Sequence, residues 1–216
     1  MGTDIHSVAQ IKKNGKFTTV EVHVAGDKRQ YNTFAILAGV CNGTNILRMK
    51  TGDGYIPISK PRGLPADFQV VDNDHPVPFE WYDWDDETRS YPNREISMGD
   101  HSHSWLLLSE LELYAQKAAT LTTYSEGIVS RAEWERCQLE KSSPQDWSTY
   151  IAGPRVIIAT EETAAIDTSA TYIRMRWQVG YLESSNLLEI IEALQKIRDK
   201  HKTTSDQVRY VFGFDS

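Results

Sequence analysis

Apolar and polar positions alternate at the start of the chain and predict a β-hairpin. Residues 4–11 and 16–24 both alternate, and Asn14-Gly15 between them suits a type I′ turn, which needs positive φ at both central residues. Such a turn pairs residues whose numbers sum to 29, which puts His6 opposite His23. One face of this hairpin is expected to be core and carries Ile5, Ala9, Ile11, Val20, Val22 and Val24. The other face carries Asp4, His6, Gln10, Thr19, Glu21 and His23.

Helical signals follow the hairpin. Residues 31–40 form a short apolar run that Gly39 or Gly43 would end, because glycine adopts the left-handed backbone at a helix C-terminus without strain. A serine followed three positions later by glutamate is the pattern of a capping box, and it predicts helix starts at Ser109 and Ser130.

The second half of the chain adds two further helices and three strands. Proline at a first turn predicts a short helix at Ser143-Pro144, and Asn186 begins a longer one that runs to about Lys200. Strands are predicted at residues 155–160, 171–179 and 207–214. These elements predict an α+β fold with a mixed, largely antiparallel sheet that starts with the N-terminal hairpin and has helices mostly on one face.

The middle of the chain breaks these patterns. Residues 42–100 are rich in Gly, Pro, Asn and Asp, and an irregular region of this length inside a compact domain is usually functional. We therefore expect the irregular region, set at residues 42–104, to hold a ligand-binding site. No repeat or low-complexity linker divides the chain, so residues 1–216 are expected to form a single domain.

Composition narrows the functional classes. The net charge of −7 argues against general nucleic-acid binding, which draws its affinity from neutralised phosphates. The longest apolar run, residues 105–108, is far shorter than a membrane span, and the first residues lack the features of a signal peptide. We therefore expect a cytoplasmic protein without a membrane partner, in which Cys41 and Cys137 are reduced, structural thiols.

Several segments together resemble an uncharacterised family of small proteins encoded by bacteriophages and prophages. They are residues 2–6 (GTDIH), 29–31 (RQY), 34–42 (FAILAGVCN), 61–65 (PRGLP), 101–106 (HSHSWL) and 208–215 (VRYVFGFD). The chain departs from the family pattern at Thr3, Gln10 and Cys41, where Cys, Glu and Arg are common. The resemblance implies a phage-like origin and an accessory role in the host cytosol, and it does not supply an active site.

Histidines and carboxylates give one set of chemical candidates. Imidazole and carboxylate groups on one hairpin face can bind a divalent metal or share a proton, and in an extended chain His101 and His103 would point the same way. The alternative is a solvated polar sheet face and a loop histidine that caps or packs. The catalytic candidates are His6, His23, His101 and His103, and the metal-ligand candidates are Asp4, His6, His101 and His103.

Arginines and aromatic residues give a second set. Guanidinium groups bind phosphate through two parallel hydrogen bonds, which makes Arg29, Arg48 and Arg62 phosphate-binding candidates. The segment at residues 51–54 lacks the Lys-Ser/Thr ending of a Walker motif and is interpreted as a tight turn. The predicted ligand pocket consists of Arg29, Tyr31, Arg62 and His103, with the arginines on phosphate and Tyr31 stacking on a base.

Three functions remain open at this point. The first is a phage counter-defence protein that binds and sequesters a small phosphorylated, nucleotide-derived signal, as a monomer or a homo-oligomer. The second is a metal- or histidine-dependent hydrolase of such a nucleotide. The third is an inhibitor that binds a host protein through the acidic, tryptophan-bearing stretch 72–87.

Overall fold

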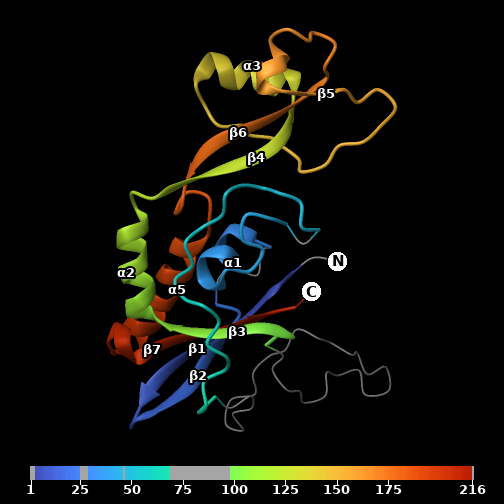
Figure 1. Cartoon of the computed structure of the whole chain (residues 1–216). Helices are drawn as coiled ribbons and strands as arrows, with labels where there is room; N and C mark the ends of the chain where they lie inside the picture. Colours follow the sequence, from blue (N-terminus) through green and yellow to red (C-terminus); the bar gives the residue numbers. More distant parts are fainter. Residues whose placement is uncertain (1–2, 25–28, 46, 69–97, 216) are drawn as a thin grey trace, which may run out of the picture.

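The computed structural model describes residues 3–24, 29–45, 47–68 and 98–215 (Figure 1). An antiparallel four-stranded sheet with the strand order β2-β1-β7-β3 forms one half of the described structure. Its strands are β1 (Ile5–Lys13), β2 (Lys16–Val22), β3 (His101–Leu107) and β7 (Val208–Phe214). The α+β class and the N-terminal hairpin are thus confirmed.

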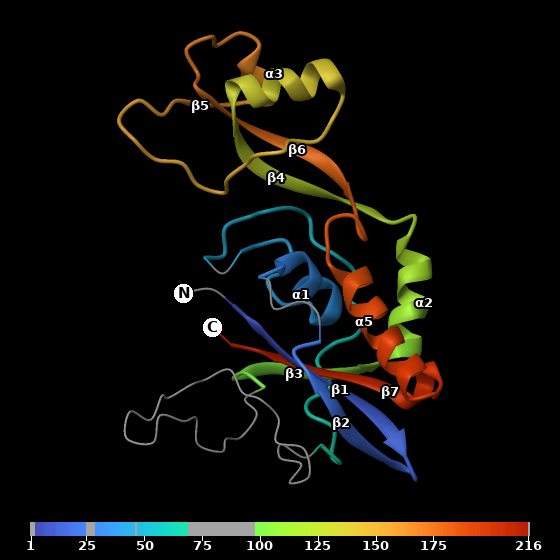
Figure 2. The same ribbon diagram turned by 180° about the vertical axis from the view of Figure 1, so that it is seen from behind.

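A second sheet lies apart from the first in both views (Figures 1 and 2). It has the order β4-β6-β5 and consists of β4 (Thr122–Ser130), β6 (Tyr172–Gly180) and β5 (Ile158–Thr160). Because β5 runs parallel to β6 whereas β4 runs antiparallel to it, the strands are mixed but largely antiparallel, as predicted. The single sheet expected from the sequence is instead two sheets.

Three helices cover one face of the first sheet (Figure 2). They are α1 (Tyr31–Ala38), α2 (Leu108–Ala118) and α5 (Leu187–Lys200), and η1 (Ser205–Gln207) leads from α5 into β7. Five large apolar side chains at helical spacing on α5 are buried, and each side chain of this size contributes roughly 1.5–3 kcal/mol when fully buried. They are Leu187, Ile190, Ile191, Leu194 and Ile197.

The remaining helices, α3 (Arg131–Glu140) and α4 (Glu161–Ala164), pack on the second sheet and enclose a smaller core. Ser130 caps α3 as predicted, since its hydroxyl accepts a hydrogen bond from the Glu133 amide at 3.1 Å. The short helix predicted at Ser143-Pro144 is wrong, because this segment is irregular. Strand β4 is absent from the predicted elements, and its mixture of Thr, Ser and Gly carries little apolar alternation. No helix in the described ranges is long and apolar enough to cross a membrane.

The other predicted helix starts are correct to within two residues. Residue 108 rather than 109 begins α2, and Glu110 accepts from the Leu107 amide at 2.8 Å. Ser109 instead bonds to Asp206 at 2.5 Å. Asn186 does precede α5, but its side-chain amide oxygen accepts from the Thr33 hydroxyl and so ties α5 to α1.

The hairpin register follows the prediction only near its turn. The pairs from Lys13↔Lys16 to Gln10↔Thr19 sum to 29, but a β-bulge at Val20 shifts the next pair to Ala9↔Glu21. An extra residue on one strand changes every pairing beyond it. His6 is therefore not opposite His23, whose amide donates to Ser7 O at 2.9 Å. Val22 packs with Val8 and Val211 instead of joining the predicted core face.

The polar face of β1 is buried, contrary to a solvated sheet face. Gln10 is 1% exposed and its amide oxygen accepts two hydrogen bonds, at 2.9 and 2.6 Å, from the buried Arg209. Asp67 also pairs with Arg209 at 2.9 Å, and the guanidinium lies 3.9 Å from the centroid of the Phe17 ring. A buried cation must be neutralised and hydrogen-bonded, and these partners do both.

Candidate functional site

A surface pocket of about 400 Å³ lies at the end of the first sheet where β1 begins. Four segments meet there: Thr3, which lies two residues before β1, the end of α1, the loop that follows α1, and the start of β3. Its described lining residues are Thr3, Ala38, Gly39, Val40, Cys41, Thr44, Asn45, Arg48, His101 and Ser102. Half of these lining residues lie in the region 42–104 that was predicted to bind a ligand, at its two ends, and the other half lie outside it.

Glycine at the end of α1 turns the chain into the pocket. Gly39 has φ 74°, the left-handed conformation, and its amide donates to Ala35 O at 2.9 Å. The Val40 amide donates to Phe34 O at 3.3 Å. These bonds satisfy carbonyls that a helix end leaves without partners. The prediction that Gly39 ends this helix is confirmed.

A turn held by Asn45 presents Arg48. The Asn45 side-chain oxygen accepts from the amides of Leu47 and Met49, both at 3.0 Å. The Arg48 amide donates to Asn45 O at 2.8 Å, and Arg48 itself has φ 57°. Side-chain oxygens of asparagine stabilise such turns because they substitute for a backbone acceptor. Arg48 is therefore fixed at the rim by a local hydrogen-bond network.

A bulge at the start of β3 aims His101 at the same pocket. Ser102 has φ 52°, and the register to β7 shifts between His101 and Ser104. The His101 ring stacks on Phe214 with centroids 6.0 Å apart, and its Nδ1 lies 3.0 Å from Ser102 Oγ. His101 and His103 therefore do not share a face, because the extended geometry assumed for this segment is interrupted.

Backbone strain concentrates around the pocket. Seven non-glycine residues in the described chain have positive φ, and three of them, Cys41, Arg48 and Ser102, line this one pocket. Such a conformation costs roughly 1–3 kcal/mol per residue and persists where the surrounding structure enforces it, often at functional sites. The strained backbone is therefore a second feature of this pocket, separate from its shape, that is typical of functional sites.

The pocket contains a cation although the chain is acidic. Arg48 lines it, none of its described lining residues is a carboxylate, and the net charge of the whole chain is −7. Asp100 lies outside the lining, with Oδ1 4.0 Å from Nε2 of His101. Arg48 has no ion-pair partner in the part of the chain that the structure describes. Cys41 adds a free thiol 4.0 Å from the Thr3 hydroxyl. An unpaired guanidinium beside hydroxyls and an imidazole is suited to binding an anion.

Of the three arginines chosen from the sequence as phosphate-binding candidates, the two assigned to the predicted pocket, Arg29 and Arg62, are already paired. Arg29 donates two hydrogen bonds to Asp4, at 2.6 and 2.9 Å, which raise the pKa of Arg29. Arg62 forms a similar pair with Glu110 at 3.0 and 2.6 Å, and this pair lowers the pKa of Glu110. Tyr31 begins α1 and packs edge-on against a core ring, Phe34. Neither arginine is available to phosphate as Arg48 is.

His6 and His103 do come together, at a glycine of β7. His6 pairs across the sheet with Gly213, and a methyl group at Gly213 would lie 2.6 Å from His103 Cδ2. His6 Nε2 lies 2.9 Å from Asp215 Oδ2, and His103 Nε2 donates to Gly99 O at 3.0 Å. His23 lies beyond β2 and His101 lies in the pocket described above, so the four histidines form no single cluster.

Asp215 is held ionised beside His6. Burial alone would raise the pKa of Asp215, but hydrogen bonds from His6 and from the Asp4 amide outweigh it and lower the pKa. Because an ionised carboxylate only accepts, His6 must donate from Nε2. The pair has the form of the carboxylate–histidine dyads that orient a catalytic base.

Two other predictions find no support among the described residues. The structure shows there no group of three or more His, Cys, Asp or Glu side chains that could hold a metal ion. The acidic stretch 72–87, with its tryptophans, lies outside the described residues.

Comparisons with known proteins do not identify the site. No protein-family model, no curated protein and no solved structure matched the chain.

Proposed function

We propose that the chain binds a small phosphorylated compound in the pocket formed by Arg48, His101 and the end of α1. The observation that carries this proposal is the unpaired guanidinium of Arg48 in a pocket whose described lining contains no carboxylate. Arg48 would hold the phosphate through two hydrogen bonds, and the hydroxyls of Thr44 and Ser102 supply neutral donors beside it.

Size and polarity favour a nucleotide-like molecule over inorganic phosphate. A volume of about 400 Å³ falls within the range of roughly 300–1,000 Å³ typical of small-molecule sites. The C-terminal end of α1, at Gly39, has a partial negative charge, which favours N–H or O–H donors over a second anion. A suitable ligand has an anionic end that binds Arg48 and an end rich in hydrogen-bond donors, such as a base or a sugar, that faces the C-terminal end of α1.

We further propose an accessory, counter-defence role in which such a signal is sequestered in the host cytosol. Three of the segments that resemble phage proteins, residues 2–6, 34–42 and 101–106, contribute to this pocket. Because residues from separate segments meet at one strained pocket, a binding role that these segments share is favoured. The ligand class suggested here is a cyclic dinucleotide or an ADP-ribose derivative.

Calorimetry with cyclic dinucleotides and ADP-ribose compounds tests the proposal. Arg48→Gln should weaken binding by about 10- to 100-fold, since hydrogen bonds to a charged group contribute about 1.5–3 kcal/mol. Arg155→Gln is the matched control, because this exposed arginine removes the same charge and lies away from the lining residues. Failure of every compound to bind, or equal affinity in both variants, would contradict the proposal.

Alkylation gives a second measure in the same experiment. Cys41 lines the pocket whereas Cys137 is 4% exposed, so bound ligand should slow modification of Cys41 and leave Cys137 unmodified throughout. Protection of Cys41 that persists in Arg48→Gln without measurable binding would indicate a cause other than the ligand.

Hydrolysis is the second candidate, and the His6–Asp215 dyad beside His103 is what favours it. Mass analysis of the ligand after incubation, with and without Mn²⁺ or Zn²⁺, separates the two functions. Intact recovery supports sequestration. Cleavage that His6→Gln abolishes would support the hydrolase, with His6 as the base.

A further inference from the structure

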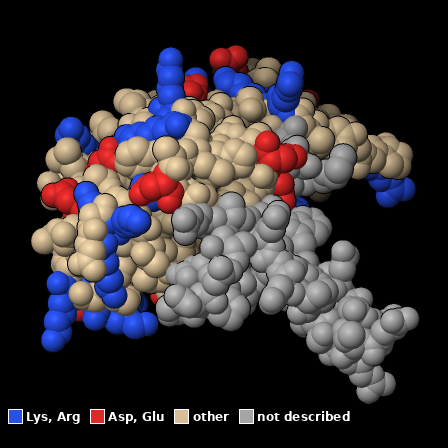
Figure 3. All heavy atoms as spheres, turned by 90° about the horizontal axis from the view of Figure 1, so that it is seen from below, with Lys and Arg blue, Asp and Glu red and all other residues tan. Residues whose placement is uncertain are grey.

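A second pocket, of about 300 Å³, lies at the opposite end of β1, between the β-hairpin and the C-terminal end of α5. Lys13 comes from β1, Thr18 from β2, Lys200 from α5, and His201 from the residue that follows α5. Figure 3 shows Lys and Arg side chains gathered at this left-hand end of the molecule. The pocket also borders the β-bulge at Val20, an irregularity that often lies next to functional sites.

The cations of this pocket repel one another. Burial lowers the pKa of His201, and the positive charges of Lys13 and Lys200 lower it further, while Glu21 opposes them. Neither lysine has an ion-pair partner among residues 3–24, 29–45, 47–68 and 98–215. Like charges brought together destabilise the folded protein, and an anion bound between them would relieve their repulsion.

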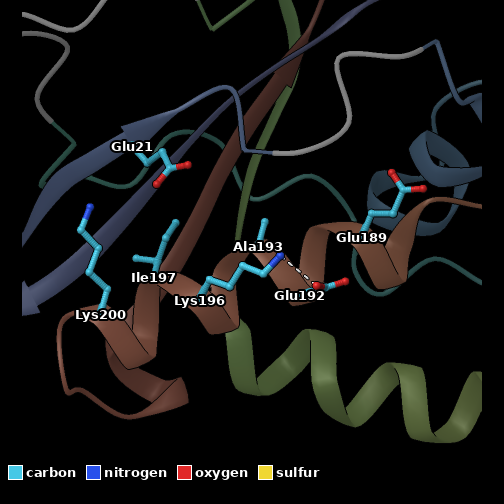
Figure 4. A pocket seen from close by; sticks show the side chains of 7 residues that line it. All are labelled: Glu21, Glu189, Glu192, Ala193, Lys196, Ile197 and Lys200. Atoms are coloured by element: carbon cyan, nitrogen blue, oxygen red, sulfur yellow. Dashed lines mark ion pairs between the residues drawn. The ribbon is translucent and has the colours of Figure 1, made fainter.

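A neighbouring groove, which also lies between the hairpin and α5, has a different arrangement of charged side chains. Figure 4 shows Lys196 turned along α5 to its ion pair with Glu192, at 2.8 Å, while Lys200 extends from α5 toward the hairpin. Glu192 thus neutralises Lys196, whereas Lys200 shares the groove with Glu21 and forms no ion pair among the described residues. The ammonium group of Lys200 is therefore available to an anion at the hairpin end of the groove.

Stabilisation of α5 explains only part of this cluster. Cations at a helix C-terminus interact favourably with the helix dipole, which accounts for Lys200 as well as for Arg198. It does not account for Lys13, which reaches the site from a different element. A ligand that bridges the hairpin and α5 would use both lysines.

We propose that this pocket is a second anion site, which binds the phosphate groups of a small molecule between Lys13, Lys200 and His201. Two ammonium groups supply the positive charge, and the His201 imidazole and the Thr18 hydroxyl supply further donors. The net charge of −7 disfavours a long polyanion, so a free di- or polyphosphate group is the chemistry that fits. This inference is independent of the function proposed for the Arg48 pocket.

Inorganic pyrophosphate is the probe, added to the full chain at constant ionic strength. In ¹H–¹⁵N NMR spectra it should shift the His201 ring and raise the pKa of that ring, because it places negative charge beside it. Replacing both lysines, in Lys13→Gln/Lys200→Gln, should weaken binding about tenfold or more, since each exposed ion pair contributes a few-fold to affinity. Lys60→Gln/Lys117→Gln is the matched control, with the same loss of charge at exposed positions outside the pocket.

The outcomes are distinct. Unchanged binding in the control and weakened binding in the pocket variant would support the proposal. An unperturbed His201 in the wild-type protein, or equal weakening in both variants, would overturn it. Tighter binding of a duplex oligonucleotide without terminal phosphates would overturn the assignment to a small molecule. Binding by Arg48→Gln should remain normal, so failure of the first pocket does not imply failure of this one.

Discussion

Gly213→Ala is the substitution with the most clearly defined cost. A methyl carbon at Gly213 would lie 1.9 Å from Met98 O and 2.6 Å from His103 Cδ2. The distance from the methyl carbon to the Met98 oxygen is more than about 1 Å shorter than the ordinary non-bonded separation of roughly 3.5 Å. The imidazole of His103 can rotate, but the carbonyl of Met98 is part of the backbone that pairs with the end of β7 through the Asp100 amide. The backbone must therefore move.

We expect a loss of about 3 kcal/mol, the upper end of the usual range for overpacking, because a rigid carbonyl cannot give way as a side chain can. For a chain of this length that corresponds to a fall in Tm of about 6–12 °C. Urea denaturation should show a lower midpoint with an unchanged m-value. Gly180→Ala is the control, since its methyl group would meet only the flexible Glu183 side chain, at 3.2 Å. A Gly213→Ala variant as stable as the control would refute the close packing of the Met98 carbonyl on β7.

Two further predictions concern charged groups. Asp67→Asn removes the carboxylate that pairs with the buried Arg209 and should cost about 1–2 kcal/mol in urea denaturation; a neutral effect would show that Gln10 alone satisfies this cation. The hydrogen bond from Arg136, followed by that from the Gln145 amide, lowers the pKa of Glu133 to about 2. Its contribution to stability is present above the ordinary pKa of 4.5 and is lost as the pH falls toward 2, and NMR titration of the Glu133 carboxyl should reproduce that value, with Arg136→Gln raising it.

The sequence predicts those parts of the fold that local signals determine. Asn14-Gly15 defines the turn, and the pairs next to it have the predicted register. Gly39 ends α1 for the predicted reason. No glycine or proline marks the bulge at Val20, so the sequence contains no comparable signal for it. The extra residue shifts the pairing of every residue of the hairpin beyond the bulge by one position.

The same limit applies to the candidate site. Sequence alone identifies arginines but cannot tell which of them has a carboxylate partner distant in the chain, as Arg29 and Arg62 do. Arg48 is distinguished from them only by tertiary structure, which places it in a pocket and gives it no ion-pair partner among the described residues. The Asn-Gly-rich segment around residues 42–45 did carry a signal for the strained turn that presents it, because asparagine and glycine favour positive φ.

Unpaired cations in an acidic chain have a consequence for selectivity. At physiological ionic strength charges interact over about 8 Å, so a small anion inside either pocket responds mainly to the cations that line it. A polyanion extends well beyond that distance and meets the surplus of carboxylates that gives the chain its charge of −7. Lowering the salt concentration should therefore strengthen binding of a mononucleotide or of pyrophosphate without a matching gain for duplex DNA. That difference would follow from the positions of Arg48, Lys13 and Lys200, and net charge alone could not produce it.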